Sequence, residues 1–251
     1  MAADASGTWL QRMTALLAKV KCGDAEIGTS PSADALAGPF DTASYLAAME
    51  YPAQLCFAIL HTSQSSHRSS RMRRQIAPIY DCLLGAGMGS KILKGDINGT
   101  CGFLRGHLEK LPGGAGATLQ GIVDYGMANV PLKKLTSDPG STVRAVLWCN
   151  RACLFITHFI KNLIDGLDGT DAARKAYEEN LKMYHGWIAG KAVGGVMSMA
   201  PAKAKIFASM GLPSEAEANA QAQAFLAVML PLTGAIVKFL EAKGANFPDK
   251  V

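Results

Sequence analysis

The chain has 251 residues, a net charge of +5 at neutral pH and a hydrophobic content of 49%. Charged residues make up only 18%, which excludes a disordered chain, because disorder needs low hydrophobicity and high charge. The positive charge is not gathered into a dense stripe interleaved with aromatic residues, which argues against nucleic-acid binding. The apolar content is high for so little charge, which suggests that helix faces line more than an ordinary core.

Three features of the sequence lead us to expect a cytoplasmic protein without a metal or other cofactor. Lys19 and Lys21 interrupt the first apolar run, so no signal peptide is indicated. Six cysteines are scattered without a CxxC pair or a ligand-spaced histidine, which predicts free thiols and no zinc site. The apolar stretch 218–237 is polar at its start and contains Pro231, so we expect a packed helix rather than a membrane span.

The period of apolar residues predicts helices along nearly the whole chain. The first helix covers 8–20 and begins at Thr8, which has capping-box spacing to a glutamine. Residues 21–38 are rich in Gly, Ser, Pro and Asp and predict a loop. Asp41 then caps a second helix that ends near Pro52.

The next part of the chain alternates apolar segments with polar connections. Residues 67–74 carry a dense basic run, which predicts a solvated connection or, alternatively, a dock for an anionic membrane surface. Residues 112–116 contain glycines but no following Gly-Lys-Ser/Thr, so they predict a flexible loop rather than a phosphate loop. The predicted helical segments here cover 53–60, 76–84 and 96–111.

The last part of the chain contains the most apolar helices. The helix over 142–164 is apolar on most of its circumference, which predicts a central position in the fold. The final helix begins at Ser214 and should be kinked by Pro231. No alternating strand pattern is convincing, so the expected class is all-α. The helices predicted in this part cover 118–128, 142–164, 172–198, a short segment up to 210, and the long final helix.

Polar side chains stand out at three places in these apolar helices. Arg144 and Trp148 lie one turn apart on the same helix face. A buried arginine needs an anion or a set of acceptors, so this pair is a candidate binding site. The alternative is a cation–π or salt-bridge pair at the end of the helix. The simplest interpretation of His185 is a hydrogen-bonded core histidine. Trp187 and Lys191 are one turn apart and are typical of a membrane-interface anchor or of ordinary surface packing. No histidine lies in an HExxH or GxSxG motif, so no enzyme is indicated.

Together these patterns resemble the glycolipid transfer protein family. The resemblance covers most of the chain from about residue 39 onward, and 50–76 looks like an insertion or a divergent region. We expect one domain over 1–251, with residues 1–38 as an N-terminal helix and loop. The segments that carry the resemblance are 96–99 (DING), 146–151 (VLWCNR), 184–188 (YHGWI) with Lys191, 200–203 (APAK) and, more loosely, 39–42 and 250–251.

The resemblance implies a two-layer, all-α sandwich that encloses the hydrocarbon chains of a lipid and binds its headgroup in a surface cleft. The implied function is non-enzymatic transfer of a sphingolipid between membranes. Such a protein needs no cofactor, contacts the membrane transiently from the cytoplasm and acts as a monomer. A lipid sensor or adaptor that binds without shuttling is the alternative of another class.

Roles for single residues also follow from the resemblance. Asp96 would accept hydrogen bonds from the lipid amide and from headgroup hydroxyls. His185 would donate to the acyl-amide carbonyl, and Trp148 would stack beneath a sugar ring. Trp187 and Lys191 would contact the membrane.

The headgroup positions mix two branches of the family. Thr100 stands where glycolipid binders carry asparagine and phosphate binders carry a basic residue. Arg144 falls where the ceramide-1-phosphate branch carries its first phosphate-binding arginine, whereas Trp148 replaces its second. Lys94 and Arg151 are further candidate headgroup contacts. We favour a glycosylated ceramide on the strength of the tryptophan, with ceramide-1-phosphate as the alternative.

Overall fold

The computed structural model describes residues 7–49, 99–198, 200–212 and 214–250. Within these ranges the regular secondary structure is helical apart from one short hairpin and two isolated strand bridges, which confirms the all-α class. The segments predicted over 53–60 and 76–84, and the basic run 67–74, lie outside the described residues. Lys94 and Asp96 lie outside them too, so their assigned roles stay predictions.

The N-terminal part follows its capping signals but contains a hairpin that was not predicted. Helix α1 (Trp9–Ala18) begins at Thr8 in a complete capping box. The predicted loop 21–38 holds strands β1 (Lys21–Cys22) and β2 (Ala25–Glu26), which pair antiparallel, and the 3-10 helix η1 (Asp34–Leu36). Gly23, at φ +64°, makes the tight turn between the strands. Asp41 caps the helix over 42–49, because its Oδ1 accepts from the Ser44 amide at 2.7 Å.

The middle of the chain is more broken than the sequence predicted. The helix predicted over 96–111 is α-helical only over 99–105 in the described part and then tightens into η3 (Leu108–Lys110). The predicted loop 112–116 lies in the 3-10 helix η4 (Pro112–Ala117), where two glycines with positive φ make a kink. Helix α6 (Leu119–Asn129) agrees with its prediction, whereas the short α7 (Leu132–Ser137) has no prediction corresponding to it.

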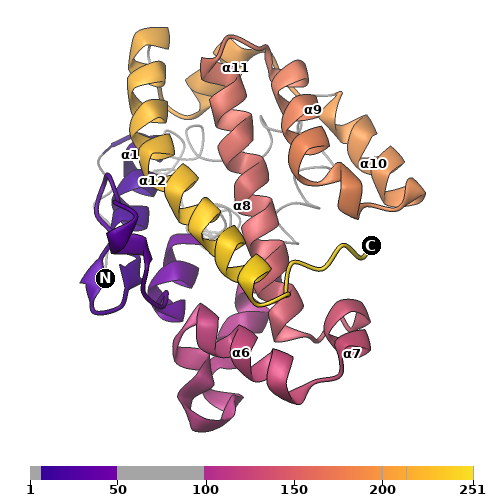
Figure 1. The fold of residues 1–251 in the computed structure, drawn as a ribbon. Helices are drawn as coiled ribbons and strands as arrows, with labels where there is room; N and C mark the ends of the chain where they lie inside the picture. The colour runs from indigo at the N-terminus through magenta and orange to yellow at the C-terminus, as the bar shows by residue number, and fades with distance from the viewer. Residues whose placement is uncertain (1–6, 50–98, 199, 213, 251) are drawn as a thin grey trace, which may run out of the picture.

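Helix α8 (Thr142–Ile164) is the central element of the fold, as predicted from its apolar circumference. It begins at Ser141, whose side chain accepts from the Arg144 amide. It packs against α6, α9 (Gly169–Asn180) and α12 (Glu215–Ala242), and Figure 1 shows α12 crossing in front of it. Gly166, at φ +100°, turns the chain out of the helix.

The single helix predicted over 172–198 is wrong. The chain forms α9, the 3-10 helix η5 (Lys182–Tyr184) and α10 (Trp187–Met197) instead. Leu181 leaves helical geometry at φ −127°, and His185 is extended at ψ 133°. The break has a tertiary cause, because it lets the His185 side chain fold back onto α9 and α8, and periodicity cannot detect such contacts.

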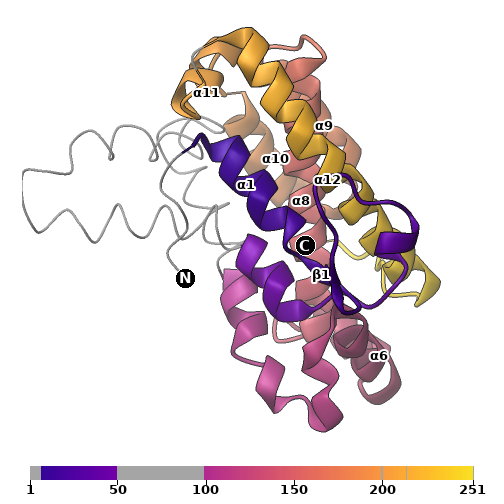
Figure 2. The same ribbon diagram turned by 90° about the vertical axis from the view of Figure 1, so that its left-hand side faces the viewer.

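The last helices are α11 (Lys203–Ser209) and α12, and α12 packs on α8. Helix α12 begins at Ser214 and contains Pro231. Figure 1 shows α12 bending along its length, which agrees with the predicted proline kink. Helix α12 packs on α1, and Figure 2 shows α1 beside it.

In the part of the chain that the structure describes, α8 and α12 are long and apolar enough to cross a membrane by length and composition alone. A core helix passes the same test. The most apolar window of α8 is 78% buried inside the protein and that of α12 is 44% buried. Both helices also pack against each other, so we describe them as core helices of the fold.

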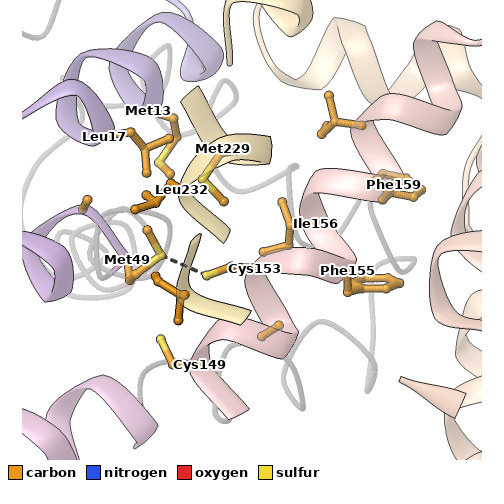
Figure 3. Packing of buried hydrophobic residues seen from close by; sticks show 14 of the residues in the cluster. Met13, Leu17, Met49, Cys149, Cys153, Phe155, Ile156, Phe159, Met229 and Leu232 are labelled. Atoms are coloured by element: carbon orange, nitrogen blue, oxygen red, sulfur yellow. Dashed lines mark hydrogen bonds between the residues drawn. The ribbon is translucent and has the colours of Figure 1, made fainter. Parts of the chain in front are cut away.

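The core between α1, α8, α12 and the helix over 42–49 is rich in sulfur (Figure 3). The Sγ atom of Cys153 lies 3.0 Å from the Sδ atom of Met49. A hydrogen bond with Cys149 and burial raise the pKa of the Cys153 thiol well above its usual value. The cysteines in the described ranges are thiols and form no disulfide with one another. Met and Cys side chains adapt their shape easily, so this core can repack.

Candidate functional site

A cleft of about 380 Å³ opens beside the N-terminal half of α8. Its size is within the range of small-ligand pockets. Its wall combines residues from the helix over 99–105, from α8 and from the η5–α10 junction. The lining residues are Gly99, Thr100, Phe103, Pro139, Arg144, Ala145, Trp148 and His185. The cleft thus brings together Thr100, Arg144, Trp148 and His185, which the sequence had placed in one headgroup site from three separate segments.

Helix α8 supplies the cleft with two side chains on one face. Arg144 and Trp148 are half-buried, and they lie four residues apart, so their side chains project from consecutive turns. Within the described ranges, no ion pair with a carboxylate involves the Arg144 guanidinium.

His185 is held in place by two aromatic side chains. Its ring stacks on Trp148, with 5.8 Å between the ring centroids and 6° between the planes. Its Nδ1 lies 3.1 Å from the Tyr177 hydroxyl. Burial, helped by the charge of Arg151, lowers the pKa of His185, so the ring is neutral at pH 7. When the Tyr177 hydroxyl donates to Nδ1, the imidazole proton lies on Nε2.

Arg151 is buried and does not line the cleft. Its guanidinium carbon lies 3.3 Å from the centroid of the Tyr184 ring. Nη2 donates to Asn246 Oδ1 at 3.2 Å and to the Phe247 carbonyl oxygen. Burial lowers the pKa of Arg151 to about 10, so the side chain stays charged at neutral pH. The structure therefore directs Nη2 toward the segment that follows α12, although the sequence suggested a headgroup contact.

Sequence reasoning missed the residues that support the cleft. Tyr177 is eight positions before His185, a spacing that predicts no side-chain contact within one helix. Their hydrogen bond forms because the chain turns between the two residues. Asn246 and Phe247 are more than ninety positions from Arg151. No local pattern could have paired residues so far apart.

The two residues predicted to contact a membrane lie at the surface. Trp187 is 74% exposed, and the Lys191 Nζ atom lies 4.2 Å from the centroid of its ring. Met183, four residues before Trp187, is 55% exposed. Large exposed apolar side chains beside a lysine are typical of a membrane-facing surface.

The Ala200-Pro201 part of the sequence resemblance has a structural role. Gly169, the first residue of α9, lies so close to this loop that a Cβ atom would be 1.7 Å from the Pro201 carbonyl oxygen. The Ala200 carbonyl accepts from the Thr170 hydroxyl at 3.2 Å. These contacts fix the loop after α10 on the start of α9.

Comparison with known proteins identifies the family. The family model described as Glycolipid transfer protein (GLTP) matches residues 70–212. A ceramide-1-phosphate transfer protein of Danio rerio is 28% identical over 151 residues, covering 58% of this chain and 70% of the relative. A glycolipid transfer protein of Danio rerio is 32% identical over 136 residues, covering 50% of this chain and 61% of the relative.

Solved structures show the same fold. The crystal structure of human ceramide-1-phosphate transfer protein in complex with 2:0 ceramide-1-phosphate superimposes with a TM-score of 0.70 at 14% identity. The superposition covers 96% of this chain and 99% of that structure, so the two proteins share one fold. Because the family model matches more than half of the residues of this chain, the chain belongs to the glycolipid transfer protein family.

Proposed function

We propose that the protein transfers a sphingolipid between membranes and leaves the lipid chemically unchanged. The matched relatives are named for the transfer of ceramide-1-phosphate and of glycolipids. The observation that carries the proposal is the cleft in which Trp148, His185 and Arg144 converge beside an apolar core. This assignment requires binding and release only, with no cofactor.

His185 supports recognition of the sphingolipid amide. A neutral imidazole with its proton on Nε2 donates one hydrogen bond, which suits the acyl-amide carbonyl. Asp96 would accept from the amide N–H, and this role stays a prediction. An amide buried with both of its polar groups paired avoids a desolvation penalty of about 1–3 kcal/mol per group. Ordinary glycerolipids have no amide, so the pair selects the sphingolipid class.

The sulfur-rich core supports enclosure of the hydrocarbon chains. Met13, Met49 and Met229 pack there with Cys153, and such side chains fill irregular spaces and rearrange easily. Each methylene group kept from water is worth about 0.8 kcal/mol. A lipid can therefore leave a bilayer without exposing its chains if this core opens to receive them.

For the headgroup we favour a sugar. Trp148 is half-buried at the wall of the cleft, where an indole face can stack on the C–H face of a sugar ring. The hydroxyl of Thr100 lines the same cleft and can bond a sugar hydroxyl. A glycosylated ceramide uses both features.

A phosphorylated headgroup is the second candidate, and Arg144 favours it. This guanidinium lines the cleft and has no carboxylate partner in the part of the chain that the structure describes. A single arginine can bind a phosphate through two parallel hydrogen bonds. Ceramide-1-phosphate would use this contact and would gain nothing from stacking on the indole.

Trp187 and Lys191 would bring the cleft to a membrane surface. The exposed indole would enter the interface, and the amine would remain among the headgroups. We propose transient peripheral binding by a monomer in the cytoplasm. A sensor or adaptor would share these contacts but would keep its lipid.

Transfer between vesicles tests the proposal. Labelled galactosylceramide, ceramide-1-phosphate and phosphatidylcholine are compared for wild type, Trp148→Ala and Arg144→Leu. The matched control is Arg174→Leu, an exposed arginine on α9 that pairs with Asp171. We expect sphingolipid transfer only, lost with Trp148→Ala if the ligand carries a sugar and with Arg144→Leu if it carries a phosphate. Mass spectrometry should recover the lipid unchanged.

The outcomes separate the candidate functions. Transfer of phosphatidylcholine at an equal rate would contradict recognition of the amide. Absence of transfer for all three lipids, with a lipid retained through purification, would replace transfer by sensing. Lipid products of altered mass would replace it by an enzyme.

A further inference from the structure

The segment that follows α12 is anchored against α8. In Figure 1 it crosses α8 and ends between α7 and α10. Ala245 is completely buried and Phe247 is 5% exposed, so the segment is packed rather than loose. Asn246 Oδ1 and the Phe247 carbonyl oxygen both accept from Nη2 of Arg151. Asp249 is close enough for its charge to favour the protonated form of Arg151.

Arg151 has unused capacity for an anion. Arg151 is 3% exposed, and its Nε is buried with no hydrogen-bond partner among the residues that the structure describes. The two acceptors bonded to Nη2 are neutral, an amide side chain and a peptide carbonyl. An anionic oxygen adds the attraction of opposite charges to the hydrogen bond, and a phosphate can accept two parallel N–H bonds from one guanidinium.

Arg151 also adjoins the headgroup cleft. It lies three residues after Trp148, and its guanidinium carbon is 5.1 Å from the Trp148 ring centroid. The positive charge of Arg144 acts on it from the cleft side. A phosphate beside Trp148 would therefore lie near two guanidinium groups. That of Arg144 lines the cleft, and that of Arg151 is bonded to the segment after α12.

We propose that residues 245–249 form a latch that withholds Arg151 from an anionic headgroup and so sets the headgroup preference of the cleft. This inference rests on the proposed transfer function. With the latch closed, Arg144 is the cation that the described lining of the cleft offers, and neutral sugars are favoured. With the latch open, Arg151 joins it, and a phosphorylated headgroup gains a second arginine.

The test loosens the latch without removing its anchors. The variant Asn246→Ala with Asp249→Asn keeps Ala245 and Phe247. Its ratio of ceramide-1-phosphate transfer to galactosylceramide transfer should rise about tenfold, the value of one added charge-assisted hydrogen bond. The rise should vanish when Arg151→Gln is added. Asp171→Asn, an equal charge change at an exposed side chain of α9, is the control and should leave the ratio unchanged.

A second readout does not depend on lipid transfer. Inorganic phosphate should raise the Tm of the latch variant more than that of the wild type or of Asp171→Asn. Equal rises, or a change in the transfer ratio that persists with Arg151→Gln, would overturn the latch. If the wild type transfers no lipid but the phosphate effect depends on the latch, the proposed function fails and the latch stands.

Discussion

Replacing Trp187 by alanine should weaken membrane binding without weakening the fold. The side chain is 74% exposed, so truncation should change the free energy of unfolding by less than about 0.5 kcal/mol. An aromatic side chain offers about 150–250 Å² of surface, so roughly 110–185 Å² of this one is free. If half of that area enters the membrane interface, its burial contributes about 1.4–2.3 kcal/mol. The partition coefficient should therefore fall by roughly 10- to 50-fold.

The assay is sedimentation with sucrose-loaded vesicles of phosphatidylcholine and an anionic lipid. Thermal unfolding is measured in parallel to show that the fold is intact. Trp187→Phe keeps most of the apolar ring and should bind nearly as well as the wild type. Lys191→Gln should lower binding only on anionic vesicles, because its contribution is electrostatic. Unchanged partition of Trp187→Ala at equal Tm would refute the membrane-facing orientation of this surface.

Three further predictions concern the support of the cleft. Tyr177→Phe removes the hydroxyl bonded to His185 and should lower sphingolipid transfer about fivefold, which corresponds to one hydrogen bond of about 1 kcal/mol. The control Tyr125→Phe should transfer at the wild-type rate. Equal rates for the two variants would contradict a role of the Tyr177 hydroxyl. Burial lowers the pKa of His185, so below about pH 6.5 the unfolded chain binds a proton that the folded chain excludes, and the free energy of unfolding should fall as the pH drops. Urea unfolding should show a flatter profile for His185→Gln, and identical slopes would contradict this cause. Gly169→Ala would place a Cβ atom 1.7 Å from the Pro201 carbonyl oxygen. The free energy of unfolding should fall by about 1–3 kcal/mol, which a lower Tm would show. An unchanged Tm would show that the loop after α10 can move away.

The helix starts could be predicted because their signals are local. Thr8, Ser141 and Ser214 each accept from a backbone amide three residues later, so the whole motif lies within four residues. Helix α8 was predictable for a similar reason, since its apolar circumference records its burial at every turn. Most cleft residues came from the family resemblance, and the structure places Thr100, Arg144, Trp148 and His185 on one wall.

The features that sequence reasoning missed depend on contacts between distant residues. The break between α9 and α10 leaves the apolar period almost unchanged, yet it turns His185 toward Trp148 and Tyr177. The burial of Arg151 depends on a carbonyl oxygen 96 residues away. An arginine on an amphipathic helix looks the same in sequence whether its partner is solvent, a ligand or another part of the chain.

Helix α8 carries both the proposed recognition residues and several core residues. Arg144 and Trp148 project into the cleft, while Cys153 and Ile156 point into the core. The helical repeat of about 5.4 Å per turn fixes the spacing of the Arg144 and Trp148 backbones along the wall of the cleft. Substituting Arg144 or Trp148 changes the chemistry of the cleft wall and leaves the core residues Cys153 and Ile156 in place. Under the proposed function, one scaffold could therefore diverge toward sugars or toward phosphates by single substitutions on α8.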